Sequence, residues 1–175
     1  DLLGKDHKIT VVGDSETFKF TPSNPWVAVN WRKKEQIEIN LSDMFNKKGI
    51  EFIAVAAQKI VADQSSIELI DGQTVDYDYL VIATGPKLAF DEIDGLGPEH
   101  YSESICTTDH AAIAGEKWKI FLEDPGPIVV GAVQGASCFG PAYEYALIMN
   151  ADLRKHKIRH KVPITFITSE PYIGH

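Results

Sequence analysis

The chain has 175 residues, 44% of them hydrophobic and 24% charged, and its formal net charge is −8. This composition is typical of a globular protein, and its acidic balance argues against a nucleic-acid-binding surface. No apolar run is long enough to span a bilayer, and no signal-peptide pattern is present. Because the chain begins at Asp1 without an initiating Met, we expect its natural start to lie further upstream.

The first third of the chain predicts the second half of a βαβ unit. Residues 2–4 resemble the end of a helix stopped by glycine, and residues 9–12 predict a buried strand that ends at Gly13-Asp14. Residues 22–31 contain two prolines, which predict a shaped loop rather than a regular element. A short helix over 41–48 and a strand over 50–55 follow.

A small antiparallel meander is predicted next, with strands over 59–61, 66–70 and 74–75. Asp71-Gly72 predicts a two-residue hairpin turn between the last two strands. Residues 77–85 then predict a buried strand that ends in small residues before Pro86, and residues 91–100 predict a linker.

The last third predicts the start of a second βαβ unit at about residue 127. A helix over 108–122, with Thr108 or Asp109 as its cap, leads to a buried strand over 128–131. A loop of small residues and a helix with Pro141 in its first turn come next, followed by a strand over 162–167. The pattern therefore predicts an α/β fold with two partial units.

The turn from Gly131 to Gly135 lies between a strand and a helix, which is the setting of a phosphate-binding loop. Its spacing is GxxxG rather than GxGxxG, and Cys138 and Phe139 would crowd a pyrophosphate, so we do not expect NAD here. Close packing of the helix against the strand is the alternative explanation. Asp14 could bind ribose hydroxyls at the end of the first strand, but Glu16 could do the same, and a solvated Asp is an equal alternative.

Two cysteines, Cys106 and Cys138, each lie near the predicted start of a helix. Such a position stabilises a reactive thiolate, and if the two meet they could form a disulfide, accept sulfide and pass on two electrons. The alternative is two buried structural cysteines. They are too few for a secreted disulfide scaffold and lack zinc-site spacing. His110, four residues after Cys106, could shuttle protons or simply cap the helix, and Glu144 matters only if its helix face is buried.

Several segments resemble known flavoproteins. Residues 78–85 (DYLVIATG) resemble a segment shared by many flavoproteins with two dinucleotide-binding domains. Residues 22–26 (PSNPW), 104–107 (SICT), 135–144 (GASCFGPAYE) and 169–175 (SEPYIGH) together resemble the bacterial sulfide:quinone oxidoreductases. The resemblance covers essentially the whole chain.

This resemblance implies a partial tandem Rossmann-like, glutathione-reductase-like fold with a small β-meander, truncated at both ends. Residues 1–105 would belong to the FAD-binding domain, and 106–175 would begin the second dinucleotide-binding-like domain. The implied enzyme oxidises sulfide to sulfur or polysulfide and passes the electrons through FAD to quinone. It would be a bacterial protein, peripheral to the cytoplasmic membrane and a possible homo-oligomer.

The resemblance also implies roles for individual residues. Cys106 and Cys138 match two of three redox cysteines, of which one forms a covalent thiol–flavin adduct. Polar residues matching groups linked to proton transfer or quinone reduction are His110, Glu144 and His175. The residues matching the flavin site are Asp14, Pro25, Thr84, Gly85 and Pro86.

The departures from the family pattern set the remaining expectations. The FAD-binding GxGxxG, the third cysteine and the membrane-binding C-terminal part do not occur in the chain, so we expect a fragment that is inactive and holds FAD weakly or not at all. The alternatives are a type II NADH:quinone reductase, a relative of flavocytochrome sulfide dehydrogenase, or a non-catalytic nucleotide-binding domain with structural cysteines.

Overall fold

A computed structural model describes residues 6–136, 138–172 and 174 and divides the chain into two compact units. The first unit comprises the chain up to Lys19 together with Glu38–Leu88, and the second comprises Phe20–Ile37 and the chain from Ala89 onward. The chain therefore leaves the first unit and returns to it. These units do not test the predicted boundary after residue 105 between an FAD-binding domain and a second dinucleotide-binding-like domain, which stays a prediction.

The first unit is built on a parallel pair of strands, β1 and β4, in which Val11 lies opposite Phe52. Helix α2, whose N-cap Asn40 accepts a hydrogen bond from the Asp43 backbone N–H at 3.0 Å, packs Phe45 against Phe52. This is the predicted strand–helix–strand order. The elements of the unit are β1 (Thr10–Val12), β2 (Thr17–Lys19), β3 (Glu38–Asn40), α2 (Leu41–Asn46), β4 (Glu51–Ile53), β5 (Ala57–Val61), the 3₁₀ turn Ala62–Gln64, β6 (Ser66–Leu69) and β7 (Thr74–Asp76).

The predicted meander is confirmed as the antiparallel sheet β5-β6-β7. Its second hairpin closes at Leu69, whose N–H donates to the Gln73 carbonyl oxygen at 2.8 Å, so three residues form the loop instead of the two predicted. Gly72 ends the turn with φ of +86°, a left-handed conformation that favours glycine.

The predicted buried strand over residues 77–85 is wrong. The segment has no regular secondary structure, and Tyr79 and Val81 are 94% and 86% exposed. A strand needs a neighbour to bond its backbone N–H and C=O groups, and no strand among the described residues pairs with this segment. The segment has the apolar composition of a strand, but the described residues contain no partner strand that would bury it.

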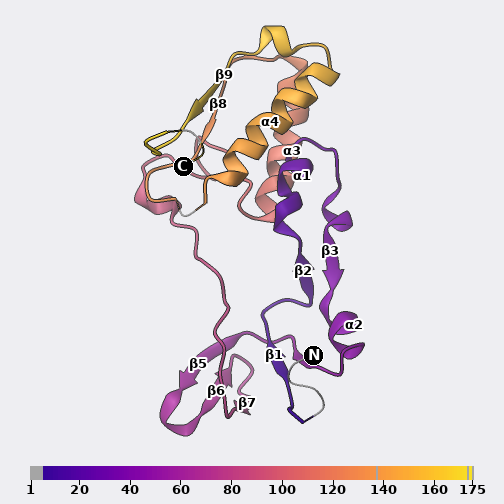
Figure 1. Ribbon diagram of the computed structural model, residues 1–175, viewed down its shortest axis with the longest axis vertical. Helices are drawn as coiled ribbons and strands as arrows, with labels where there is room; N and C mark the ends of the chain where they lie inside the picture. Colours follow the sequence, from indigo (N-terminus) through magenta and orange to yellow (C-terminus); the bar gives the residue numbers. More distant parts are fainter. Residues whose placement is uncertain (1–5, 137, 173, 175) are drawn as a thin grey trace. The chain divides into compact units, whose positions relative to one another are not determined.

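The second unit contains a parallel strand pair, β8 and β9, and two long helices, α3 and α4 (Figure 1). Gly131 ends β8 so close to β9 that a Cβ there would lie 1.8 Å from the Ile167 carbonyl oxygen. The glycine therefore serves close packing between two strands, and not the helix–strand packing of the alternative explanation. The elements are the 3₁₀ turn Thr21–Ser23, α1 (Asn24–Ala28), the 3₁₀ turn Lys34–Gln36, the 3₁₀ turn Phe90–Glu92, α3 (Thr108–Glu123), β8 (Ile128–Gly131), α4 (Gly140–Lys155), the 3₁₀ turn Arg159–Lys161 and β9 (Ile164–Ile167).

Helix α1 corrects the prediction that residues 22–31 hold no regular element. Pro25 lies in the first turn of the helix, where its missing N–H costs nothing. The helix lies against a face of α3 made of small residues, where a Cβ on Gly115 would approach the Val27 carbonyl oxygen to 2.8 Å. Small residues on α3 thus let the backbone of α1 come close.

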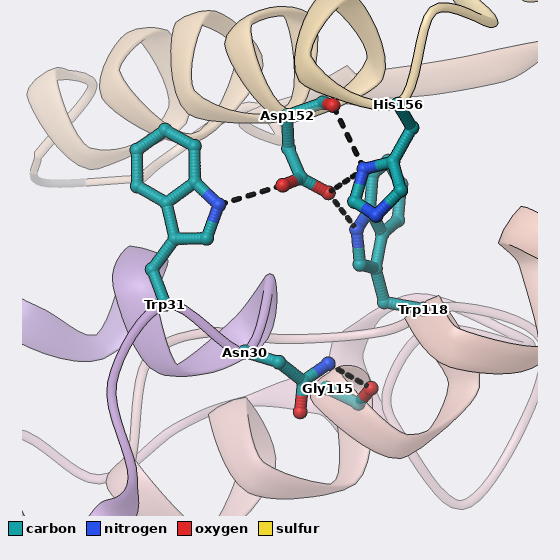
Figure 2. A network of polar contacts seen from close by, with 6 residues as sticks. All are labelled: Asn30, Trp31, Gly115, Trp118, Asp152 and His156. Carbon is teal, nitrogen blue, oxygen red and sulfur yellow. Dashed lines mark hydrogen bonds and ion pairs between the residues drawn. The ribbon is translucent and has the colours of Figure 1, made fainter.

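A buried carboxylate, Asp152, joins α4 to α3 and to the segment that follows α1 (Figure 2). Its two oxygens accept hydrogen bonds from the indole N–H groups of Trp31 at 2.6 Å and Trp118 at 2.7 Å. His156 Nδ1 lies 3.4 Å from the same carboxylate, whose residue is only 1% exposed. A polar group this deep is tolerated because both oxygens have donors.

Candidate functional site

The two cysteines occupy equivalent positions in the second unit. Cys106 directly precedes Thr107, the N-cap of α3, and Cys138 directly precedes Phe139, the N-cap of α4. The Thr107 hydroxyl accepts a hydrogen bond from the His110 backbone N–H at 3.1 Å, so the cap lies one residue before the predicted Thr108. Both thiols are free and exposed. A reactive cysteine must be accessible, whereas a structural cysteine is usually buried.

Helices α3 and α4 run in roughly the same direction (Figure 1), and side-chain contacts connect them at two points. Near their starts, Tyr145 of α4 packs against the apolar cluster that contains Ala111 and Ala114 of α3. Further along, Trp118 of α3 bonds to Asp152 of α4. Both cysteines therefore precede the same end of one helix pair, where unpaired backbone N–H groups and the helix dipoles stabilise negative charge.

His110 lies in the first turn of α3, and its ring contacts Phe90 at a centroid distance of 5.6 Å. Its Nδ1 atom is buried and has no hydrogen-bond partner among the described residues. Buried polar atoms are seldom left unpaired, so this nitrogen could still take a hydrogen bond from a bound molecule. The residue is half-buried rather than a surface cap.

Glu144 lies in the second turn of α4 and is half-buried. Beside it, the Tyr143 hydroxyl bonds to Glu170, which also accepts from the Thr168 hydroxyl at 2.8 Å, and Gly174 N–H donates to the Tyr143 oxygen at 3.1 Å. These bonds tie the last part of the chain to the start of α4. His175 lies outside the described residues.

The residues predicted to hold a flavin divide between the two units. Asp14, Thr84, Gly85 and Pro86 belong to the first unit and are exposed, whereas Pro25 belongs to the second and is buried. Gly85 has φ of +73°, and a Cβ there would meet nothing within 4 Å, so this turn is open to an approaching ligand.

Sequence reasoning missed the buried polar residues that support the cysteines. Asn24, 1% exposed, donates from Nδ2 to the Ile105 carbonyl oxygen at 2.8 Å and accepts from the Thr108 hydroxyl at 3.1 Å. The sequence pattern likewise did not distinguish Asp152 or Tyr145 from ordinary residues of a helix. Burial raises the pKa of the Tyr145 phenol well above its ordinary value, and the nearby Glu103 carboxylate adds to the rise.

Within residues 6–136, 138–172 and 174 no group of three or more His, Cys, Asp or Glu side chains could hold a metal ion. None of the helices in the described part of the chain has both the length and the apolar character needed to cross a membrane.

Comparison with known proteins confirms the resemblance seen in the sequence. The chain is 49% identical over 173 residues to sulfide-quinone reductase of Aquifex aeolicus, covering 99% of the chain and 40% of that protein. It is 28% identical over 162 residues to mitochondrial sulfide:quinone oxidoreductase of Dictyostelium discoideum, covering 90% of the chain and 35% of that protein. No family model matches the chain.

The fold is confirmed by a solved structure. The X-ray structure of the Aquifex aeolicus sulfide:quinone oxidoreductase matches the chain with a TM-score of 0.90 and 48% identity, over 99% of the chain and 40% of that structure. The chain is thus a mixed helix and strand structure that follows Rossmann-like oxidoreductase domains, and it spans about two fifths of the length of this relative.

Proposed function

We propose that this chain is the part of a sulfide:quinone oxidoreductase that carries two of the redox sulfurs, Cys106 and Cys138. The observation that carries the proposal is the pair of free, exposed thiols at the same end of helices α3 and α4. The 49% identity to a sulfide-quinone reductase over nearly the whole chain supports the substrate and the acceptor.

In the proposed reaction a hydrosulfide ion attacks a cysteine sulfur that is held in a disulfide. The S–S bond breaks, leaving a persulfide on one cysteine and a thiolate on the other. The helix N-termini next to Cys106 and Cys138 stabilise that thiolate. Over the whole cycle HS⁻, quinone and one proton give sulfur at oxidation state zero and quinol, so two electrons move from sulfide to quinone.

Protons must move during this cycle, and His110 is well suited to handle them. Its unpaired Nδ1 can accept a proton near the start of α3 and release it later. Glu144 and His175 are proposed for the same task on the quinone side.

FAD, when bound, would take the two electrons from sulfur and deliver them to quinone. The exposed turn of Thr84, Gly85 and Pro86 fits a flavin contact, because Gly85 leaves the backbone open to a ligand. Asp14, exposed at the end of β1, could bind ribose hydroxyls. Pro25 fits less well because it is buried against the protein.

The partners and location follow from the same proposal. The whole protein would be bacterial, would meet sulfide and quinone at the surface of the cytoplasmic membrane through a region outside this chain, and could form a homo-oligomer. The relative from Aquifex aeolicus supports the bacterial origin.

The alternatives are less well supported by the site. An NADH-using reductase needs a phosphate loop at Gly131, but this glycine is required by the approach of β8 to β9, and Cys138 and Phe139 follow it. The same observations are compatible with a relative of flavocytochrome sulfide dehydrogenase, which a haem-containing partner would distinguish from a sulfide:quinone oxidoreductase. In a binding domain with structural cysteines the sulfurs would be buried, whereas both thiols of this chain are exposed.

The test is the rate of flavin reduction by sulfide in the whole protein, followed by the loss of flavin absorbance. We expect Cys138→Ala to slow reduction by about a hundredfold or more, as removal of a covalent catalyst does. Flavin content and the unfolding midpoint of the variant check that it is folded and loaded. Unchanged reduction in the variant would refute the role of Cys138.

A further inference from the structure

Asn24 is buried beneath the segment that carries Cys106. It is 1% exposed and lies at the start of α1, yet both polar atoms of its amide bond to the Cys106 segment. Nδ2 donates to the carbonyl oxygen of Ile105, the residue before the cysteine, at 2.8 Å. Oδ1 accepts from the hydroxyl of Thr108, two residues after it, at 3.1 Å.

The rest of this segment is fixed in the same way. The Cys106 backbone N–H donates to the Ser104 hydroxyl at 3.1 Å, and Thr107 caps α3. Ser104 and Thr108 are buried, while Cys106 between them is exposed. A rigid, hydrogen-bonded base thus supports a single exposed thiol.

We propose that Asn24 is the positioning residue of Cys106: it holds the cysteine backbone at the N-terminal end of α3 and thereby sets the reactivity of the thiol. The consequence for sulfide oxidation rests on the proposed function, whereas the effect on thiol chemistry does not. Small displacements of a reacting group are costly, which is why such groups are held by buried hydrogen bonds.

A buried asparagine could also serve stability alone, and the chain offers a matched control for that possibility. Asn30 follows α1 and donates from Nδ2 to the Gly115 carbonyl oxygen in the middle of α3 at 2.6 Å (Figure 2). It joins the same two parts of the unit but bonds far along α3 from the cysteine. Because Asn30 has φ of +60°, glycine is the replacement that removes its bond without backbone strain.

The test measures how fast each thiol exchanges with a small aromatic disulfide. Cys106 is followed in the 175-residue chain with Cys138→Ser, and Cys138 is followed with Cys106→Ser. Asn24→Leu keeps the side-chain size and adds no charge, and it removes both bonds, so the Ile105 carbonyl oxygen and the Thr108 hydroxyl lose this partner. We expect it to slow exchange at Cys106 roughly three- to tenfold, since the thiolate loses its place at the helix N-terminus, and to leave Cys138 unchanged.

Thr108→Val provides a second variant if Asn24→Leu fails to fold. It removes one of the two bonds and should slow Cys106 in the same direction by a smaller factor, while Asn30→Gly should change neither thiol. Simple loosening of the structure would instead make exchange faster. An unchanged or faster Cys106 in the Asn24 variant would overturn the proposal.

A last experiment distinguishes a failure of this inference from a failure of the proposed function. In the whole protein, Asn24→Leu should slow flavin reduction by sulfide, as Cys106→Ser should to a greater extent. If Cys106→Ser leaves that reduction intact, the role of Cys106 in sulfide oxidation fails. The thiol-exchange result would still decide whether Asn24 positions the cysteine.

Discussion

Tyr145 is a half-buried residue of α4 whose ionisation the structure perturbs. Burial, together with the Glu103 carboxylate, raises the pKa of its phenol above the ordinary value of 10.0. Above about pH 10 the unfolded chain therefore loses this proton while the folded chain keeps it, so the free energy of unfolding falls as the pH rises. Tyr145→Phe removes the titrating group and keeps most of the packing.

We expect the wild-type chain to lose about 1 kcal/mol more stability than Tyr145→Phe between about pH 9 and pH 11. Urea unfolding followed by circular dichroism at the two pH values measures this. The other tyrosines and the lysines titrate in both proteins, so the difference isolates Tyr145. Equal losses in the two proteins would show that its phenol is not perturbed.

At the scale of single residues, the exposed cysteines could be predicted from the sequence, whereas the roles of the buried polar side chains could not. Cys106 and Cys138 could be predicted at helix starts because caps and proline mark those starts in the chain. Asn24 and Asp152 could not, because a buried Asn or Asp has the same local pattern as a solvated one. Only the distant Ile105 carbonyl group and the indole N–H groups show what these side chains do.

One buried carboxylate, Asp152, links helix α4 to helix α3 and to the segment after α1. In Asp152→Asn, the amide nitrogen must face an indole N–H, which leaves that donor buried without an acceptor. We expect a loss of about 2–3 kcal/mol in the free energy of unfolding, measured by urea denaturation. Asp109→Asn is the matched control, because Asp109 is an exposed partner of Lys34 and its replacement should cost less than about 1 kcal/mol. Equal losses would mean that the indole bonds contribute little.

Elements with local signals were predicted well, and those that depend on partners were not. The meander and the two long helices follow from turn residues and caps. The segment 77–85 has the apolar composition of a strand, but composition cannot supply the neighbouring strand that its backbone needs. Helix α1 was missed for the opposite reason, because proline usually excludes a helix, whereas Pro25 lies in the first turn of this one, where proline is favoured.

For the whole molecule, the order of the elements could be predicted but their grouping could not. The sequence indicated two partial βαβ units in succession, and the parallel pairs β1–β4 and β8–β9 agree with this. The transfer of Phe20–Ile37 to the second unit has no local signature. It depends on α1 fitting against small residues of α3 that lie some eighty positions further along the chain.

The flavin contact proposed for Thr84, Gly85 and Pro86 leads to a prediction for the 175-residue chain itself. These residues are exposed, and no strand among the described residues pairs with their segment, so the described part of the chain offers little protein surface to bury a flavin there. We therefore expect the purified chain to be colourless after desalting and to quench added FAD fluorescence only weakly. The whole protein, prepared in the same way, serves as the control and should retain its flavin. A yellow chain with one FAD per molecule would show that these residues and their neighbours already form a complete flavin site.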